Sequence, residues 1–449
     1  MPLNAVIKEK GTDKMNIRFY NAKILTMEEP VQIIEGELWV GGTTILYAGD
    51  GTDKDKVYEK NGNNPVIWDR EIDCKGNLLM PGFKDAHTHS AMTLLRSYAD
   101  DMPLQDWLNK QVFPVEAKMG YDDIYHLTKL AVLEYLTSGI TGVMEMYLDP
   151  YAIQEAFNEC GMRNVQVSGI NNFGPSLEEM EKRYLSLNGK NELSSFMLGF
   201  HAEYTCTKEL LENIGAMAHK YKAPVFTHNS ETALEVKECR ERYGVSPTVL
   251  FEQLGIYDFG GGGYHCVHMC DEDFEVFKKR NLTAVTNPAS NLKLASGIAP
   301  ISRYLKEGIP VAIGTDGPAS NNCLDMFREM FLVTGLAKYR DEDASSTDAL
   351  EVLKMATVNG AKAMGWKDCE TLTPGSRADL IMIDLNQPNM QPVHNISKNI
   401  VYAGSKQNVK MTMINGKVLY ENGNFYIGTE SEEIYKKCNE ISRKLELEA

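Results

Sequence analysis

Between residues 78 and 318, short apolar runs rich in β-branched residues alternate with longer stretches of helical periodicity. Each apolar run ends in a cluster of polar residues, and eight such runs occur: 78–89, 139–146, 164–172, 196–204, 223–231, 263–269, 282–290 and 310–317. In the intervening stretches, such as 122–138, apolar residues recur every three or four positions, which is typical of amphipathic helices. Parallel strands need helical crossovers, so eight strand–helix units predict a (β/α)8 TIM barrel. A doubly wound open sheet is the alternative that this pattern leaves open.

The two ends of the chain have a different pattern, with short alternating strands and tight turns. Such strands occur early, at 16–27 and 36–49, and return late, at 378–385, 409–420 and 424–428. Neither end alone holds enough strands to bury one face of a sheet. We therefore expect both ends to combine into one small β-sandwich domain. The expected division is 1–77 and 371–430 for this domain, 78–370 for the barrel and 431–449 for a terminal helix.

Histidines and one aspartate fall at the ends of the predicted barrel strands. His87 and His89 end the first run, His228 belongs to the end of the fifth, and Asp316 ends the eighth. The C-terminal ends of barrel strands form one mouth, and residues two apart on a strand point the same way. Three imidazoles and a carboxylate suit one divalent ion, Zn²⁺ or Fe²⁺, with an open position for water. A lone His-x-His pair is weak evidence, but the four residues on three strands together indicate a metal site.

Other polar residues lie near this predicted site. Glu231, three residues after His228, can reach a substrate without binding the metal, as a proton shuttle must; a favourable first-turn glutamate is the alternative. His268 could hydrogen-bond the metal-bound water, or be a buried structural histidine. Strand parity places His265 on the other side, so we expect it to pack outside the site. His201 stands where binuclear barrel hydrolases often carry a bridging carboxylated lysine, which favours a single metal ion.

Charge and composition narrow the classes of partner. The chain has 62 acidic and 46 basic residues, a net charge of −16, which repels phosphate backbones and anionic lipids. Nucleic-acid polymers and membrane surfaces are therefore poor partners, and a small neutral or cationic ligand is favoured. Nine scattered cysteines, an odd number, fit reduced thiols in a cytoplasm. No stretch of about 18 apolar residues and no secretory signal is found in the sequence.

Five segments carry a resemblance to a known family: 81–119, 227–232, 265–269, 287–300 and 314–322. They resemble the amidohydrolase superfamily and, more narrowly, the 5′-methylthioadenosine/S-adenosylhomocysteine deaminases, and the likeness runs from about residue 16 to 428. The resemblance implies hydrolytic deamination of adenine nucleosides, with metal-bound hydroxide attacking C6 and ammonia leaving. It also implies one divalent metal per subunit. Zinc is the default for this ligand set, although iron or manganese fits the same geometry.

The resemblance also implies roles for individual residues. The implied metal ligands are His87, His89, His228 and Asp316. Glu231 is expected to protonate the ring nitrogen beside the attacked carbon. His268, together with Asp316, is expected to steer the hydroxide.

The implied substrate contacts are His201 to a purine ring nitrogen, Trp107 over the purine, and Glu116 to the ribose hydroxyls. One departure concerns the substrate's 5′ group. Family members that bind the homocysteine carboxylate bring arginines from the loops after the third strand, whereas residues 166–180 contain none. Arg163 precedes this stretch at the wrong end of its strand. We therefore expect methylthioadenosine, adenosine or 5′-deoxyadenosine to be preferred over S-adenosylhomocysteine, unless another loop or subunit supplies an arginine.

Two other readings remain open. Another aminohydrolase or chlorohydrolase of the same superfamily would act on guanine or a triazine, but Glu116 favours a substrate with a ribose. A non-catalytic scaffold protein is disfavoured, because all four metal-ligand positions and Glu231 are present. Dimers and tetramers are common for such barrels, so a homo-oligomer is compatible with the sequence, which identifies no interface.

Overall fold

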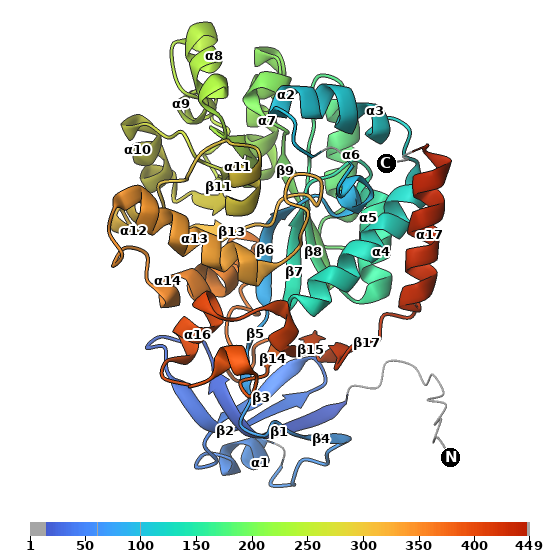
Figure 1. The fold of residues 1–449 in the computed structure, drawn as a ribbon, viewed down its shortest axis with the longest axis vertical. Coiled ribbons are helices and arrows are strands. Elements are labelled where there is room, and N and C mark those ends of the chain that lie inside the picture. Colours follow the sequence, from blue (N-terminus) through green and yellow to red (C-terminus); the bar gives the residue numbers. More distant parts are fainter. Residues whose placement is uncertain (1–14, 61, 99, 447–449) are drawn as a thin grey trace.

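The structure is a computed structural model that describes residues 15–60, 62–98 and 100–446, and its larger domain is a parallel barrel (Figure 1). Eight parallel strands pair in chain order, from β6 to β13. They are β6 (Phe83–Thr88), β7 (Ile140–Glu145), β8 (Arg163–Val167), β9 (Ser194–Gly199), β10 (Val225–Asn229), β11 (Gly261–His265), β12 (Thr283–Thr286) and β13 (Val311–Ile313). The Asp316 N–H donates to the His87 carbonyl over 2.9 Å, which links the last strand's end to the first. The predicted (β/α)8 barrel is confirmed.

Helices follow the strands and cover the outside of the barrel. The main ones are α4 (Tyr121–Thr137), α5 (Pro150–Cys160), α6 (Leu177–Leu187), α7 (Lys208–Tyr221), α8 (Ala233–Tyr243), α9 (Pro247–Gln253), α10 (Asp271–Arg280), α11 (Pro288–Lys293), α12 (Ile301–Lys306), α13 (Met326–Asp341), α14 (Ala349–Lys354) and α15 (Gly360–Ala363), with the short turns η3 (Glu203–Thr205) and η4 (Met355–Asn359). Several begin at a side-chain cap: Asp149 accepts from two N–H groups of α5, and Asp325 does the same for α13. These caps fix where each helix leaves the mouth of the barrel.

Between β6 and α4, an excursion of four short helical turns lies over the mouth. It consists of η1 (Ser90–Leu95), α2 (Leu104–Asp106), η2 (Trp107–Val112) and α3 (Phe113–Glu116). The η2 segment is a π-helical turn. Pro114, at the start of α3, has no N–H to continue an α-helical hydrogen-bond ladder, which accounts for the widened turn before it.

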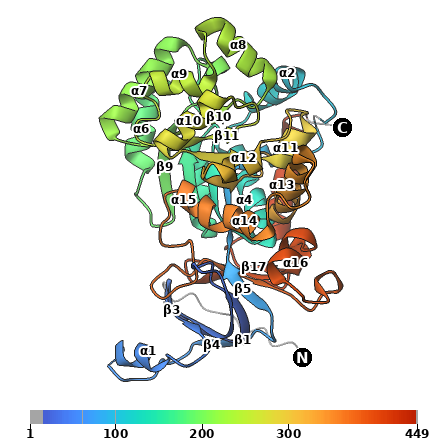
Figure 2. The same ribbon diagram turned by 90° about the vertical axis from the view of Figure 1, so that its left-hand side faces the viewer.

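The smaller domain is built from both ends of the chain, as predicted, and lies beneath the barrel (Figures 1 and 2). Its nine strands form one sheet, ordered β17-β16-β15-β14-β5-β1-β2-β3, with β4 paired to β1. They are β1 (Asn16–Leu25), β2 (Ile33–Gly41), β3 (Thr44–Gly49), β4 (Arg70–Asp73), β5 (Leu78–Pro81), β14 (Leu380–Ile383), β15 (Val409–Ile414), β16 (Lys417–Glu421) and β17 (Asn424–Phe425). Side chains from β1, β2, β14 and β15 share one core, so the sheet curves around it.

The remaining helices belong to the chain-end segments: α1 (Asp55–Lys60), η5 (Pro388–Met390), α16 (Ile396–Tyr402), η6 (Lys406–Asn408) and α17 (Ser431–Lys444). Helix α17 returns to the barrel and packs along α4, where Lys444 pairs with the buried Asp123 at 2.9 Å (Figure 1). Among the described residues, no helix is long and apolar enough to cross a membrane. The N-terminal residues 1–14, where a secretory signal was sought, lie outside the described residues.

The first predicted strand run, 78–89, is two strands rather than one. Residues 78–81 form β5 and pair with β14 of the small domain, and the barrel begins at Phe83. The break falls at Gly82, where a Cβ atom would lie 2.1 Å from the Thr141 side chain. Only glycine allows this close approach, so the chain passes from one domain to the other within a single residue.

Candidate active site

The four residues predicted as metal ligands lie together at the barrel mouth. Ligand atoms of His87, His89 and His228 all lie within 4.8 Å of one another, and all three side chains are buried. The Asp316 Oδ1 atom lies 3.3 Å from Nε2 of His89 and 3.7 Å from Nε2 of His87. Beneath them Tyr264 stacks on His87 at 3.8 Å between ring centroids and belongs to the barrel's apolar interior.

Backbone carbonyls orient two of the imidazoles. The Nδ1 of His228 donates to the His201 carbonyl at 2.7 Å, and the Nδ1 of His89 bonds to the Met146 carbonyl. In His228 this leaves Nε2 directed to the cluster with its lone pair unprotonated, the tautomer that binds metal. In His89 it directs Nε2 at the Asp316 carboxylate, 3.3 Å away. Both ring nitrogens of His87 are buried without a hydrogen-bond partner among the described residues. Such an orphaned imidazole at the centre of the cluster fits a metal ligand.

The charge of the cluster also suits a cation. Burial, reinforced by the neighbouring rings, lowers the pKa of His87 and His228 well below the ordinary value, so both are neutral. Burial alone would raise the pKa of Asp316, but its hydrogen bond to His89 holds that pKa well below its usual range. Burial likewise opposes a charge on His89, yet Asp316 raises its pKa to about 9. The carboxylate thus favours a positive charge beside it, which a divalent ion held by these residues would provide.

The structure corrects the expected positions of His265 and His268. His265 does not pack outside the site: its Nε2 lies 3.9 Å from Oε2 of Glu231 and 4.0 Å from Oδ2 of Asp316. The alternation of side chains along a strand does not hold at His265, because β11 ends there in a γ-turn and the φ of His265 is +68°. The Cys266 N–H donates to the Tyr264 carbonyl at 2.9 Å and closes this turn.

His268 lies on the loop beyond this turn and lines a surface cleft beside α8. Its Nε2 donates to the Ser296 carbonyl at 2.6 Å. Among the described residues, His268 has no hydrogen bond or ion pair with Asp316. Among the described residues it is therefore His265, and not His268, that lies within 4.0 Å of a carboxylate oxygen of Asp316.

Glu231 is held at the edge of the cluster with only 7% of its surface exposed. Its Oε1 accepts from the Ser296 hydroxyl at 3.1 Å, and Oε2 faces His265. Its backbone N–H donates to Glu235 at 2.8 Å, which anchors the turn between β10 and α8. Among the described residues, Glu231 belongs to neither set of side chains close enough to hold one metal ion, so its carboxylate is placed to serve a substrate rather than the metal.

The mouth excursion brings Trp107 and Glu116 toward the same site. Trp107 is 5% exposed, and its indole N–H is buried without a partner among the described residues. Oε1 of Glu116 is likewise buried and unpaired. Burial raises the pKa of Glu116 to about 7, against a hydrogen bond from Tyr147 and the field of His89. Two orphaned polar atoms facing the mouth fit a ligand that carries its own polar groups.

His201 ends the fourth strand run and lies beside His228, with 4.8 Å between the ring centroids. Burial lowers the pKa of His201 to about 4, so the ring is neutral. Its Nδ1 lies 3.1 Å from the Thr205 hydroxyl. A neutral ring with one nitrogen engaged leaves the other for a ligand.

Sequence reasoning missed the residues that hold the cluster in place. Ser290 donates to Oδ2 of Asp316 at 2.5 Å, Asn291 bonds Nδ1 of His265 at 2.7 Å, and Ser296 supports Glu231. All three lie in the segment 287–300, which the sequence marks as a motif without assigning individual roles. Strand length was the available signal for His265, because a five-residue strand that begins within the glycine run at 260–263 ends there.

Comparison with known proteins shows which family the chain belongs to. The model of the amidohydrolase family matches residues 78–419. A 5-methylthioadenosine/S-adenosylhomocysteine deaminase of Caldanaerobacter subterraneus subsp. tengcongensis is 40% identical over 416 residues, covering 91% of this chain and 93% of that protein. Its counterpart in Thermoanaerobacter pseudethanolicus is 38% identical over 417 residues, covering 91% and 94%.

Among solved structures, a zinc-bound adenosine deaminase from Xanthomonas campestris superimposes with a TM-score of 0.89 and 29% identity, covering 96% of this chain and 98% of that one. The family match spans most of the barrel and continues into the small domain, and both relatives align over nearly their whole length. This chain belongs to the amidohydrolase family.

Proposed function

We propose that this protein is a metal-dependent deaminase that hydrolyses adenine nucleosides to the inosine analogue and ammonia. The observation that carries this proposal is the placing of Glu231 and His265 side by side at the edge of the histidine–aspartate cluster. This arrangement places a proton donor and a proton acceptor together beside the cluster, as hydrolysis of a C–N bond there requires. The relatives named as adenine-nucleoside deaminases support the choice of substrate.

The metal ligands in this proposal are His87, His89, His228 and Asp316. A divalent ion held there would supply a Lewis acid that makes water nucleophilic at neutral pH. Zinc is the proposed ion, because three imidazoles and one carboxylate suit it and the adenosine deaminase structure contains it.

The side chains around the cluster would manage the protons of the reaction. The attacking water gives up a proton toward Asp316 and the neighbouring Nε2 of His265 as its oxygen bonds to C6. Glu231 delivers a proton to N1, which draws electrons away from C6. The proton taken up at Asp316 and His265 then passes to the exocyclic amine, and the remaining hydroxyl proton returns to Glu231 as the C6–N bond breaks, so that ammonia leaves and the 6-oxo purine remains. Because His265 occupies the place expected for His268, the water-steering role passes to His265.

Trp107, Glu116 and His201 are the proposed substrate contacts. Trp107 would cover the purine, and His201 would donate to another ring nitrogen in the tautomer whose Nδ1 accepts from Thr205. Glu116 would accept hydrogen bonds from the ribose hydroxyls. Its unpaired oxygen favours a nucleoside over guanine or a triazine, because neither of these alternatives offers a hydroxyl to it.

We further propose that the preferred 5′ group is uncharged. No cation occurs in the loop between β8 and α6, at 168–176. The next arginine along the chain, Arg183 of α6, is already engaged, with Glu179 at 3.2 Å and the Leu148 carbonyl at 3.4 Å. A substrate carboxylate would therefore have to compete with Glu179 for the guanidinium. On this argument, methylthioadenosine, adenosine and 5′-deoxyadenosine are the better substrates.

The setting that we propose is a cytoplasmic homo-oligomer. All nine cysteines are free thiols, and seven of them are buried, which fits a reducing compartment. The native mass, measured by light scattering at several concentrations, tests the oligomeric state.

Ammonia release by zinc-loaded protein tests the function. The panel contains methylthioadenosine, 5′-deoxyadenosine, adenosine, S-adenosylhomocysteine, adenine and guanine. Turnover of the nucleosides is expected, with the highest kcat/KM for an uncharged 5′ group. If the protein turned over guanine alone, the proposed substrate class would be wrong. Equal kcat/KM values for methylthioadenosine and S-adenosylhomocysteine would refute the proposed preference for an uncharged 5′ group.

A further inference from the structure

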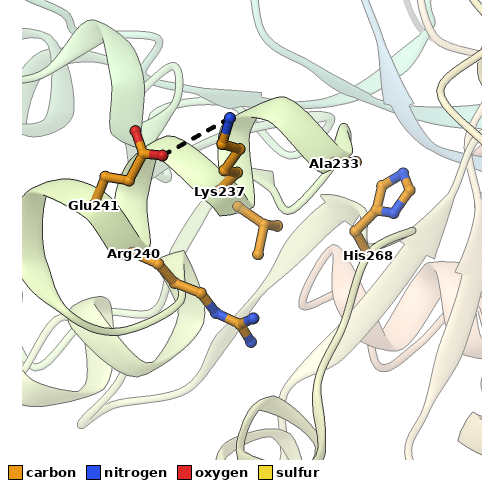
Figure 3. Close-up of a pocket in the computed structure, with 6 residues that line it drawn as sticks. Ala233, Lys237, Arg240, Glu241 and His268 are labelled. Atoms are coloured by element: carbon orange, nitrogen blue, oxygen red, sulfur yellow. Dashed lines mark ion pairs between the residues drawn. The ribbon is translucent and has the colours of Figure 1, made fainter.

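His268 has a place in the molecule that the reaction described above does not use. It lines a surface cleft of about 430 Å³ against α8, together with Val236, Lys237 and Arg240. Figure 3 shows that His268 lies on the opposite side of this cleft from Arg240 and Glu241 of α8. The half-buried ring thus has one edge at the protein surface, while its Nε2 is committed to the Ser296 carbonyl at 2.6 Å.

We propose that His268 is a positioning residue for the proton-donating carboxylate of Glu231, acting through Ser296. This inference rests on the proposed deaminase function and adds a residue outside the cluster to it. Two hydrogen bonds in series carry it: the His268 ring fixes the Ser296 backbone, and the Ser296 hydroxyl holds Oε1 of Glu231 at 3.1 Å. Ser296 is 6% exposed, so water does not readily replace either bond.

The loop between α11 and α12 needs such a clamp. Ala295 and Gly297, on either side of Ser296, both have positive φ, of +55° and +129°. A side chain at Gly297 would meet Val267 at 2.9 Å, so the loop lies directly against the segment that carries His268. A backbone held in this conformation without regular secondary structure depends on its anchors. The Ser296 N–H donates to the Asn291 carbonyl at 2.8 Å, and His268 anchors the Ser296 carbonyl.

A second anchor lies two residues further along and provides a matched control. Arg340 of α13 donates to the Ile298 carbonyl of the same loop. Arg340 and His268 both line a second cleft, of about 500 Å³, which also lies beside α8. Removing Arg340 releases the Ile298 carbonyl and leaves the bonds of Ser296 in place. Removing His268 releases the Ser296 carbonyl, so that only the Ser296 N–H, which donates to the Asn291 carbonyl at 2.8 Å, still ties this backbone.

The test compares His268→Gln with His268→Leu. Glutamine keeps an N–H donor for the Ser296 carbonyl, whereas leucine keeps only the bulk. Displacement of a catalytic group by about 1 Å can cost about 100-fold in rate. We therefore expect kcat to fall by up to that factor in His268→Leu with little change in KM, and to recover in His268→Gln. Metal content should stay at the wild-type level in both variants, because His268 is not a ligand.

A double-mutant cycle with Ser296→Ala shows whether the effect passes through Ser296. Loss of a hydrogen bond to a charged acceptor corresponds to roughly tenfold to 100-fold in kcat. In the Ser296→Ala background, His268→Leu should cause no further loss. Arg340→Met should leave kcat near wild type.

Three results would overturn the proposal. Equal damage by His268→Gln and His268→Leu would mean that the imidazole itself takes part in the chemistry. An undiminished effect of His268→Leu in the Ser296→Ala background would mean that it does not act through the hydroxyl. Wild-type kcat in His268→Leu would mean that no clamp is needed.

A crystal structure of His268→Leu gives a readout that does not depend on turnover. The Ser296 hydroxyl should have left Glu231, and an intact 3.1 Å contact would contradict the proposal. If the wild-type protein released no ammonia from any nucleoside, the proposed function would fail, while the crystallographic comparison would still decide the role of His268.

Discussion

The ion pair between Arg163 and Asp379 joins the base of the barrel to the small domain, and its loss should destabilise the whole protein. Arg163 opens β8 and is 1% exposed, and its guanidinium binds both oxygens of Asp379, at 2.6 and 3.0 Å. The guanidinium also lies over the Trp366 ring, 4.7 Å from its centroid. Asp379 directly precedes β14 and accepts from the Asn415 N–H at 2.8 Å. Both partners of the pair are therefore buried between the two domains.

Replacing Arg163 by methionine keeps much of the side-chain volume but leaves the Asp379 carboxylate buried without its main partner. Breaking a buried ion pair from one side costs about 3–5 kcal/mol. Unfolding entropy is about 2.1 cal/mol/K per residue, or roughly 0.9 kcal/mol/K for a chain of this length. The expected fall in Tm is therefore about 3–5 °C. The positive charge of the buried Lys84 also stabilises the Asp379 carboxylate. The fall in Tm should therefore lie nearer to about 3 °C than to about 5 °C.

Scanning calorimetry at one fixed scan rate measures this shift, with the double variant Arg163→Met/Asp379→Leu as the matched control. Removing both charges leaves no buried carboxylate, so the double variant should be more stable than Arg163→Met alone. kcat should not change in either protein, because the pair lies at the opposite end of the barrel from the mouth. A Tm within 1 °C of wild type for Arg163→Met, or a double variant less stable than the single one, would refute the reasoning.

Three further predictions concern the site itself. Burial raises the pKa of Glu116 to about 7, so this carboxyl is neutral below that pH and ionised above it. Because the ionised form accepts hydrogen bonds from the ribose, KM for a nucleoside should fall as pH rises through 7. A Glu116→Gln enzyme whose KM shows the same pH dependence would contradict this prediction. Removing the metal with a chelator should lower Tm and abolish turnover, since both nitrogens of His87 would then be buried and unpaired; recovery on adding zinc, followed by calorimetry and ammonia release, is the check. Glu231→Gln should reduce kcat by about 10²–10⁴-fold at unchanged metal content; a smaller loss in steady-state assays would remove Glu231 from the proton-transfer role.

Much of the fold and the cluster could be predicted because periodicity and strand ends are properties of the chain itself. Eight strand–helix units fix a barrel, and a barrel brings its strand ends together, so His87, His228 and Asp316 could be grouped across more than 200 residues. The small domain could be predicted because each end of the chain holds too few strands to bury one face of a sheet by itself.

Local backbone turns could not be predicted in the same way. The γ-turn at His265 reverses which histidine faces the site, and it depends on two consecutive positive φ angles that the letters do not reveal. The split at Gly82 depends on how closely Thr141 approaches from the neighbouring strand. Tertiary packing decides both, and pattern reasoning has no access to it.

The pairing of β5 with β14 has a consequence for how the chain acquires its structure during synthesis. β5 ends at Pro81 and β14 begins at Leu380. The ribosome therefore makes about 300 residues after β5 before β14, its partner on this edge, exists. Until then, β5 presents an unpaired edge, open to wrong partners. The barrel lies between the two strands in sequence, and its folding brings their attachment points together, which removes most of the entropy of closing so long a loop. We therefore expect the barrel to form first and the small domain to close last.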